Sequence, residues 1–132
     1  MAANTNPVFT LTPRIGGANV SATQDSSYTA PTHTVTVLTG GTNGTRIDEI
    51  DCVGLGTTVA GVIQLYLYDV SNTTYHPIDT FLVTVVTPST TVAPFLQKLY
   101  FQSLILPTNW NLVATSFAAS QLIQVLAYGG DF

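Results

Sequence analysis

The sequence predicts an all-β protein, a single antiparallel β-sandwich of jelly-roll type with about eight strands. Three observations predict this class. Helix signals are nearly absent, because no window of the 132 residues keeps an apolar period of 3.6 residues. Several windows alternate apolar and polar residues instead, and the β-branched residues Thr and Val, which suit pleated surfaces, are abundant. Short strands at regular spacing with turn residues between them are typical of sandwiches and barrels.

Two strands are expected in the first forty residues. A short first strand is expected around Val8 to Leu11, stopped by Pro13. A Gly- and Ser-rich stretch follows from Gly16 to Ser27. The second strand, Thr34 to Leu38, alternates threonine with apolar residues, so its threonines are expected to face water and its valines the core.

A third strand follows a turn at residues 40–44, of which three are glycines. This strand is expected from Arg46 to Val53. Its apolar positions slip phase once, which indicates a β-bulge near Asp48 and Glu49.

The clearest strand in the sequence is Gly61 to Asp69. Its residues fall on two faces, with Ile63, Leu65 and Leu67 on one and Val62, Gln64, Tyr66 and Tyr68 on the other. The second face is amphipathic, so its two tyrosines are candidates to cover a partner surface. A hairpin turn is expected at residues 69–72, and the returning strand at Ile78 to Val86.

The last third of the chain is expected to hold three more strands. Phe95 to Phe101 alternates as a strand, and residues 107–109 turn the chain. The final two strands, Asn111 to Ala118 and Leu122 to Tyr128, are expected to pair with each other across residues 119–121.

The composition bounds the domain organisation and the partners. One domain is expected for 132 residues, with residues 1–13 as an N-terminal arm or edge strand and residues 14–132 as the sandwich. Three basic residues and a net charge of −4 give no footprint for a nucleic acid. No run of 18 apolar residues is present, so no membrane partner is expected. The single cysteine, Cys52, cannot form a disulfide within the chain.

No residue pattern indicates catalysis, a cofactor or a metal, so we do not expect an enzyme. His33 and His76 are the two histidines, and neither is flanked by a recognisable nucleophile motif. One cysteine and two separated histidines do not give the ligand spacing of a zinc site. The acidic residues Asp48, Glu49 and Asp51 point to alternate sides of an extended strand, so we interpret them as a solvated strand face.

The surface chemistry predicts a protein–protein interface. Charged residues make up 8% of the chain, so Thr, Ser, Asn and Gln must do most of the solvation. The aromatic and aliphatic side chains exceed what one inner layer can hold, and exposed apolar patches mark contact sites. The candidate interface residues are Tyr66, Tyr68, Tyr100, Phe101 and Trp110. For Trp110, at a loop tip, three interpretations stay open: an anchor of the loop on the core, a partner contact, and a platform for a sugar ring.

Several runs of the sequence resemble small structural proteins of tailed bacteriophages. The two longest are TVTVLTGGTNGTRI at residues 34–47 and GTTVAGVIQLYLYD at residues 56–69. The chain is also similar to this family in Val85 to Ser89 before an aromatic strand, in Leu106-Pro107 before a tryptophan loop, and in its end, Gly129 to Phe132. The resemblance extends from about Arg14 to the end. One departure is Val70, which follows Asp69 where the family often has glycine.

The resemblance implies a virion protein, and within that class a capsid decoration (cement) protein on the outer surface of the head, made in the host cytoplasm. It implies a β-rich homotrimer whose partners are its own copies and the major capsid protein, with no cofactor. The segment Ala2 to Pro13 is a candidate to reach along the shell. The alternative is a tail- or baseplate-associated adhesin domain that binds host glycan through loop tips such as Trp110.

Overall fold

The computed structural model of the chain describes residues 9–132. Within this range the chain forms eight strands and no helix, and so no helix that could cross a membrane. The strands are β1 (Thr12–Asn19), β2 (Val35–Thr39), β3 (Thr45–Gly54), β4 (Gly61–Asp69), β5 (Thr74–Val83), β6 (Leu96–Leu106), β7 (Trp110–Ser116) and β8 (Ile123–Asp131).

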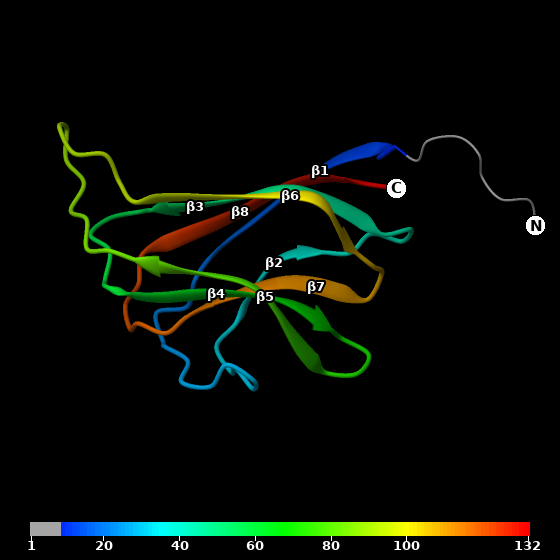
Figure 1. The fold of residues 1–132 in the computed structure, drawn as a ribbon, viewed down its shortest axis with the longest axis horizontal. Helices are drawn as coiled ribbons and strands as arrows, with labels where there is room; N and C mark the ends of the chain where they lie inside the picture. The colour runs from blue at the N-terminus through cyan, green and yellow to red at the C-terminus, as the bar shows by residue number, and fades with distance from the viewer. Residues whose placement is uncertain (1–8) are drawn as a thin grey trace, which may run out of the picture.

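The eight strands form two four-stranded sheets that pack as the two layers of a sandwich (Figure 1). Sheet A has the order β1-β8-β3-β6, and sheet B has the order β2-β7-β4-β5. Each strand n is hydrogen-bonded antiparallel to strand 9 − n, so β1 pairs with β8, β2 with β7, β3 with β6 and β4 with β5. The predicted all-β sandwich is confirmed, and this strand order is compatible with a jelly roll.

The core lies between the two sheets and consists of the inward-facing side chains of both. On sheet A it includes Ile50 and Cys52 of β3, and on sheet B it includes Ile63 and Leu65 of β4, all fully buried. Full burial of an aliphatic side chain of this size stabilises the fold by roughly 1.5–3 kcal/mol. The alternation that the sequence shows on β4 therefore places its Ile–Leu face inward.

Two local predictions around β3 and β4 are confirmed. The register of β3 against both of its neighbours shifts between Ile47 and Glu49, which is the predicted bulge. The turn after β4 is closed by Asp69, whose Oδ1 accepts hydrogen bonds from the backbone N–H groups of Ser71 (3.1 Å) and Asn72 (3.3 Å). An aspartate at the start of a turn commonly makes this arrangement.

The first strand lies later in the chain than the sequence predicts. Leu11 precedes β1, Val8 lies outside the described residues, and Pro13 is part of the strand rather than its end. β1 is an edge strand of sheet A, where a residue without an N–H group is tolerated. Gly16, predicted to begin a loop, lies within β1. A Cβ there would come within 2.2 Å of the Val37 carbonyl oxygen of the opposite sheet, so this close approach requires glycine.

The predicted pairing of the last two strands is wrong. β7 lies in sheet B between β2 and β4, whereas β8 lies in sheet A between β1 and β3. The connection at residues 119–121 therefore crosses from one layer to the other. Turn residues mark where the chain reverses, but they do not specify whether the next strand pairs beside the last one or packs in the opposite sheet.

Two strand boundaries also differ from the prediction. β5 begins at Thr74 rather than Ile78, and it includes Pro77 because β5 is an edge strand of sheet B. β6 continues past Phe101 to Leu106. The extension contains a register shift against β3, opposite the bulge described above, so the alternation that defines the strand in the sequence is interrupted there.

Cys52 is expected to be unreactive in the folded protein. Burial, and then the negative charges of Asp51 and Asp79, raise the pKa of the Cys52 thiol to about 12. We predict no labelling by Ellman's reagent at pH 8 in the native state and one reactive thiol per chain in urea, because the thiolate is the reactive form. Rapid stoichiometric labelling without denaturant would contradict the described core.

Candidate interaction surface

The outer side of sheet A presents a row of side chains from all four of its strands. Ile15 of β1 is paired with Tyr128 of β8, which is paired with Glu49 of β3, which is paired with Tyr100 of β6. Side chains directly opposite each other in a sheet share one face. The next residue of β3, Ile50, is fully buried in the core, so this row points away from the core.

Two further rows extend the same surface. The second row contains Leu126, Asp51 and Lys98, and the third contains Gln124, Val53 and Leu96. We call this surface the open face: Ile15 of β1, Leu126 and Tyr128 of β8, Glu49, Asp51 and Val53 of β3, and Leu96, Lys98 and Tyr100 of β6.

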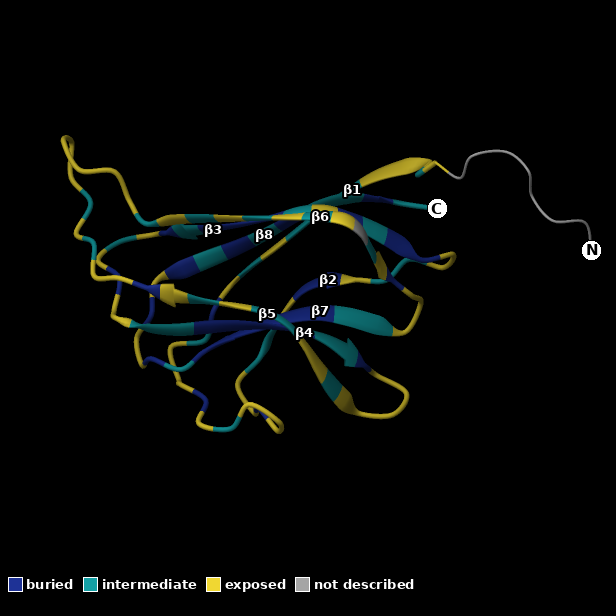
Figure 2. Cartoon of the chain, viewed as in Figure 1, coloured by how far each residue is buried: buried dark blue, intermediate teal, exposed yellow. Residues whose placement is uncertain are grey.

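The open face exposes large apolar side chains to water. Ile15 is 68% exposed, Leu96 is 53% exposed and Tyr100 is 73% exposed. Figure 2 shows exposed stretches along β1 and β6, the two edge strands of sheet A. Leu126 and Tyr128 between these two strands are half-buried. An apolar surface of this kind marks a contact site more often than chance.

The one cation of the open face is paired with both of its carboxylates, which leaves one net negative charge. The Lys98 Nζ lies 3.4 Å from Glu49 Oε1 and 3.4 Å from Asp51 Oδ2. The hydrogen bond with Asp51 is the largest of the contributions that raise the pKa of Lys98, and Glu49 adds to it. The ammonium group is therefore held by its own chain between the exposed apolar residues Leu96 and Tyr100.

The other two cations of the chain are also bound to its own acids. Arg14 of β1 points to the inner side of sheet A, where it donates to Asp131 (2.8 Å) and to the Thr39 carbonyl oxygen (3.1 Å). The Arg46 Nε lies 2.9 Å from Asp48 Oδ1. All three basic residues are thus paired with acidic residues of the same chain, and the outside of β1 carries no cation.

The outer side of sheet B, in contrast, is covered by the connection between β1 and β2, residues 20–34. Tyr66 of β4 lies beneath this connection, fully buried, and its hydroxyl donates to the Tyr28 carbonyl oxygen (2.9 Å). The Tyr28 ring stacks on Phe117 with centroids 4.1 Å apart. The placement of Tyr66 at a partner surface is therefore wrong, because a distant segment of the same chain covers it.

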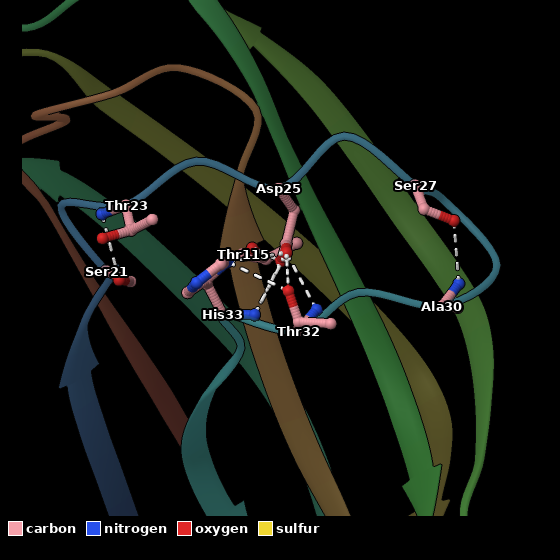
Figure 3. Close-up of polar contacts among 8 residues, drawn as sticks. All are labelled: Ser21, Thr23, Asp25, Ser27, Ala30, Thr32, His33 and Thr115. Carbon is pink, nitrogen blue, oxygen red and sulfur yellow. Dashed lines mark hydrogen bonds and ion pairs between the residues drawn. The ribbon is translucent and has the colours of Figure 1, made fainter.

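A buried carboxylate, Asp25, attaches this connection to sheet B (Figure 3). Asp25 Oδ1 accepts hydrogen bonds from the backbone N–H groups of Thr32 (2.8 Å) and His33 (3.0 Å), and Oδ2 accepts one from the Thr115 hydroxyl of β7. His33 Nδ1 lies 3.2 Å from Oδ1. Burial alone would raise the pKa of Asp25, but these hydrogen bonds outweigh it and hold the pKa below its ordinary value.

No role for Asp25 was predicted from the sequence, although one signal was present. Asp25 is the only charged residue between Arg14 and Arg46. A single carboxylate in a long uncharged segment indicates an anchor. No cation is nearby in the sequence to pair with it, and backbone N–H groups can donate hydrogen bonds to it instead.

The five predicted interface residues do not form one surface. Tyr66, Tyr68 and Trp110 belong to sheet B, whereas Tyr100 and Phe101 belong to sheet A. Of the five, Tyr100 lies on the open face.

Three of these rings lie against other side chains of the chain. Half-buried Tyr68 stacks on Tyr75 with centroids 4.4 Å apart, and half-buried Trp110 stacks on His76 with centroids 5.3 Å apart. Phe101 packs against the core. Trp110 therefore anchors its loop, one of the three interpretations left open by the sequence.

The described residues form neither a metal site nor a pocket. Between residues 9 and 132, no three His, Cys, Asp or Glu side chains gather as a metal site would require, and no pocket is found. His33 is engaged with Asp25 and His76 with Trp110. The open face is the feature of the described chain that we consider as a binding site.

Comparisons with known proteins identify no family. No protein-family model matches the chain. No curated protein matches it either. Among solved structures, the chain is similar to one from the crystal structure of the T13 IBDV viral particle, with a TM-score of 0.35 and 15% sequence identity. The match covers 99% of this chain and 35% of that chain, so this chain spans about a third of the length of its structural neighbour.

Replacing Asp25 is expected to destabilise the fold strongly. Asp25→Ala removes the acceptor of several buried hydrogen bonds and leaves the Thr115 hydroxyl without its partner, which costs about 3 kcal/mol of the free energy of unfolding. Urea denaturation followed by circular dichroism measures this loss. The control is Asp48→Ala, which breaks a partly exposed ion pair with Arg46 and should cost less than about 1 kcal/mol. Equal losses in the two variants would contradict the anchoring role of Asp25.

The contribution of Asp25 should also depend on pH in one direction. Because the pKa of Asp25 is lowered in the folded state, its stabilisation is complete above its ordinary pKa of 3.8 and is lost as the pH falls through the folded-state value. The difference in stability between wild type and Asp25→Asn should therefore be constant near neutral pH and shrink in acid. Urea midpoints measured from pH 7 to pH 2 test this, and a difference that grows in acid would count against it.

Proposed function

We propose that this chain is a structural protein of a tailed-phage virion, a decoration protein that stabilises the head. It sits on the outer surface of the capsid as a homotrimer and contacts the major capsid protein as well as its own copies. It is made in the host cytoplasm and acts without a cofactor and without enzymatic activity.

The observation that carries the proposal is the open face of sheet A. Ile15, Leu96 and Tyr100 are exposed on one side of one sheet, around a cluster in which Lys98 is already paired with Glu49 and Asp51. Interface centres favour aromatic residues and are depleted of free charges. A protein that binds other proteins over a broad surface needs an exposed apolar face with few free charges.

The fold and the sequence give further support. A two-sheet sandwich of eight strands is rigid, and its strand order is compatible with the jelly rolls from which many capsid domains are built. Because a fold alone does not determine a function, the phage assignment rests on the resemblance of residues 34–47 and 56–69 to small phage structural proteins.

A decoration protein works by mass action. A ligand that binds the assembled shell but not its free subunits stabilises the shell by RT ln(1 + [L]/Kd), which is about 2.7 kcal/mol per site at a concentration one hundred times Kd. An oligomer engages several sites of the lattice at once, so a modest affinity at each site is sufficient.

The alternative, a tail- or baseplate-associated adhesin domain, has less support. A sugar platform needs a free aromatic face, whereas Trp110 is half-buried and one face of its ring stacks on His76. No other observation favours a glycan site, and the alternative stays an untested prediction.

Binding to phage heads tests the proposal. Heads assembled without this chain are mixed with the purified protein and sedimented, and the bound fraction gives the affinity. We expect wild-type protein to bind and to raise the temperature at which heads release their DNA. Leu96→Ser/Tyr100→Ser should weaken binding at least about tenfold, because each of these side chains is worth roughly 1.5–3 kcal/mol when it is buried against the head or a neighbouring copy, and an oligomer that dissociates loses its several attachment points.

The matched control for this experiment is Leu82→Ser. Leu82 is 72% exposed on β5, an edge strand of the other sheet, so its loss should leave the affinity unchanged. Wild-type protein that does not bind heads would overturn the decoration role. Equal weakening by the Leu82 variant and by the Leu96/Tyr100 variant would overturn the assignment of the open face.

A further inference from the structure

Exposed apolar residues gather at both edges of sheet A. At one edge, Phe9 and Leu11 directly precede β1 and are 70% and 82% exposed, and Ile15 lies within β1. We call these three residues the N-terminal stripe. At the other edge, Leu96 and Tyr100 project from β6, and we call them the β6 pair. Figure 1 shows β1 and β6 in the same layer, and the strand order places β8 and β3 between them.

The segment before β1 is held against sheet A. The Leu11 N–H donates to the Asp131 carbonyl oxygen (2.7 Å). A Cβ on Gly130 would meet the Thr10 side chain at 2.7 Å, so Thr10 lies directly against the end of β8. These contacts place Thr10 and Leu11 at this edge of sheet A, and Phe9 directly precedes them.

The polarity of the first half of β1 is inverted relative to a solvated edge strand. The inner side carries Arg14 there and the outer side carries Pro13 and Ile15, whereas in the second half Ala18 packs against the core and Asn19 is exposed. A sheet with one face in water normally places polar residues outward and apolar residues inward. The inversion indicates that protein, rather than water, covers the outside of β1.

Both edges of sheet A are protected against simple strand addition. Pro13 interrupts the row of N–H groups on β1, and β6 is bent by the bulge that follows Tyr100. Proline and bulges are devices that prevent edge-to-edge pairing. A contact at these edges is therefore made by side chains of the open face and not by extension of the sheet.

The two edges are compatible in charge as well as in polarity, because the Arg14–Asp131 pair is neutral and the charges beside the β6 pair leave one net negative charge. Arg14, next to the N-terminal stripe, is bound to Asp131 of its own chain, and Lys98, between the residues of the β6 pair, is bound to Glu49 and Asp51. Neither edge presents an uncompensated cation. An uncharged apolar stripe is complementary to an uncharged apolar pair, and the chain carries both.

We propose that a second copy of this chain covers the open face, with the N-terminal stripe of one copy packed on the β6 pair of the next. The inference rests on the proposed function and deepens it, because it names the residues that join the subunits. Two different patches meet in this contact, so it is heterologous, and such contacts close into a ring when the rotation between copies allows it. Three copies make the proposed trimer.

Engineered disulfides test this contact directly. β1 and β6 are separated by two strands, so Ile15 and Tyr100 of one chain lie about 14 Å apart, beyond the roughly 7 Å limit between the Cα atoms of a disulfide. A disulfide in the double variants Ile15→Cys/Tyr100→Cys and Ile15→Cys/Leu96→Cys can therefore form only between copies. The native Cys52 is buried and does not interfere.

Under mild oxidation, at least one of the two double variants should give covalent dimers and trimers on a non-reducing gel, with no species above the trimer. The single variants Ile15→Cys and Tyr100→Cys should stay monomeric on the same gel. Because the replaced side chains are exposed in the isolated chain, the reduced variants should keep the circular dichroism spectrum of the wild type.

Two results would overturn the proposed contact between copies. Efficient cross-linking of a single variant would indicate a two-fold contact and overturn the proposal, as would the absence of cross-links in both double variants. Head binding by wild-type protein separates the two claims: binding without cross-links leaves the decoration role standing and removes this contact. Cross-linked trimers that do not bind heads would keep the contact and remove the decoration role.

Discussion

Backbone hydrogen bonds join β1 to β8, β2 to β7, β3 to β6 and β4 to β5, and the rest of the structure depends on this nested pairing. Together with the pairing of β3 with β8 and of β4 with β7, it assigns β4 to one sheet and β6 to the other, so the tyrosines of β4 and of β6 cannot share a surface. It also makes β1 and β6 the two edges of sheet A. The open face, with exposed apolar residues at both of its edges, is a direct consequence of this strand order.

The two outer surfaces of the sandwich differ because one long connection covers only one of them. Residues 20–34 cross sheet B, and Asp25 attaches them there through backbone N–H groups and Thr115. Burial of Tyr66 follows from this cover. Sheet A has no comparable cover among the described residues, and the one cation on its outer side is paired with carboxylates of the same chain. The protein therefore has one closed surface and one surface that is suited to binding other proteins.

Features that depend on neighbours along the chain could be predicted from the sequence, and features that depend on long-range packing could not. The bounds of β4 and the bulge near Asp48 follow from local alternation. The burial of Tyr66 depends on a segment more than thirty residues away in the sequence, and the separation of β7 from β8 depends on which sheet each strand joins. Proline predicted the end of a strand at Pro13, whereas its position on an edge strand makes it acceptable there.

The central claim is that sheet A works as a contact surface between copies of the chain, and the mass of the protein in solution tests this most directly. Light scattering coupled to size-exclusion chromatography gives that mass without reference to shape. The account predicts a single species of about three times the chain mass of 14.0 kDa. A monodisperse species of 14.0 kDa, unchanged as the protein concentration is raised, would contradict it.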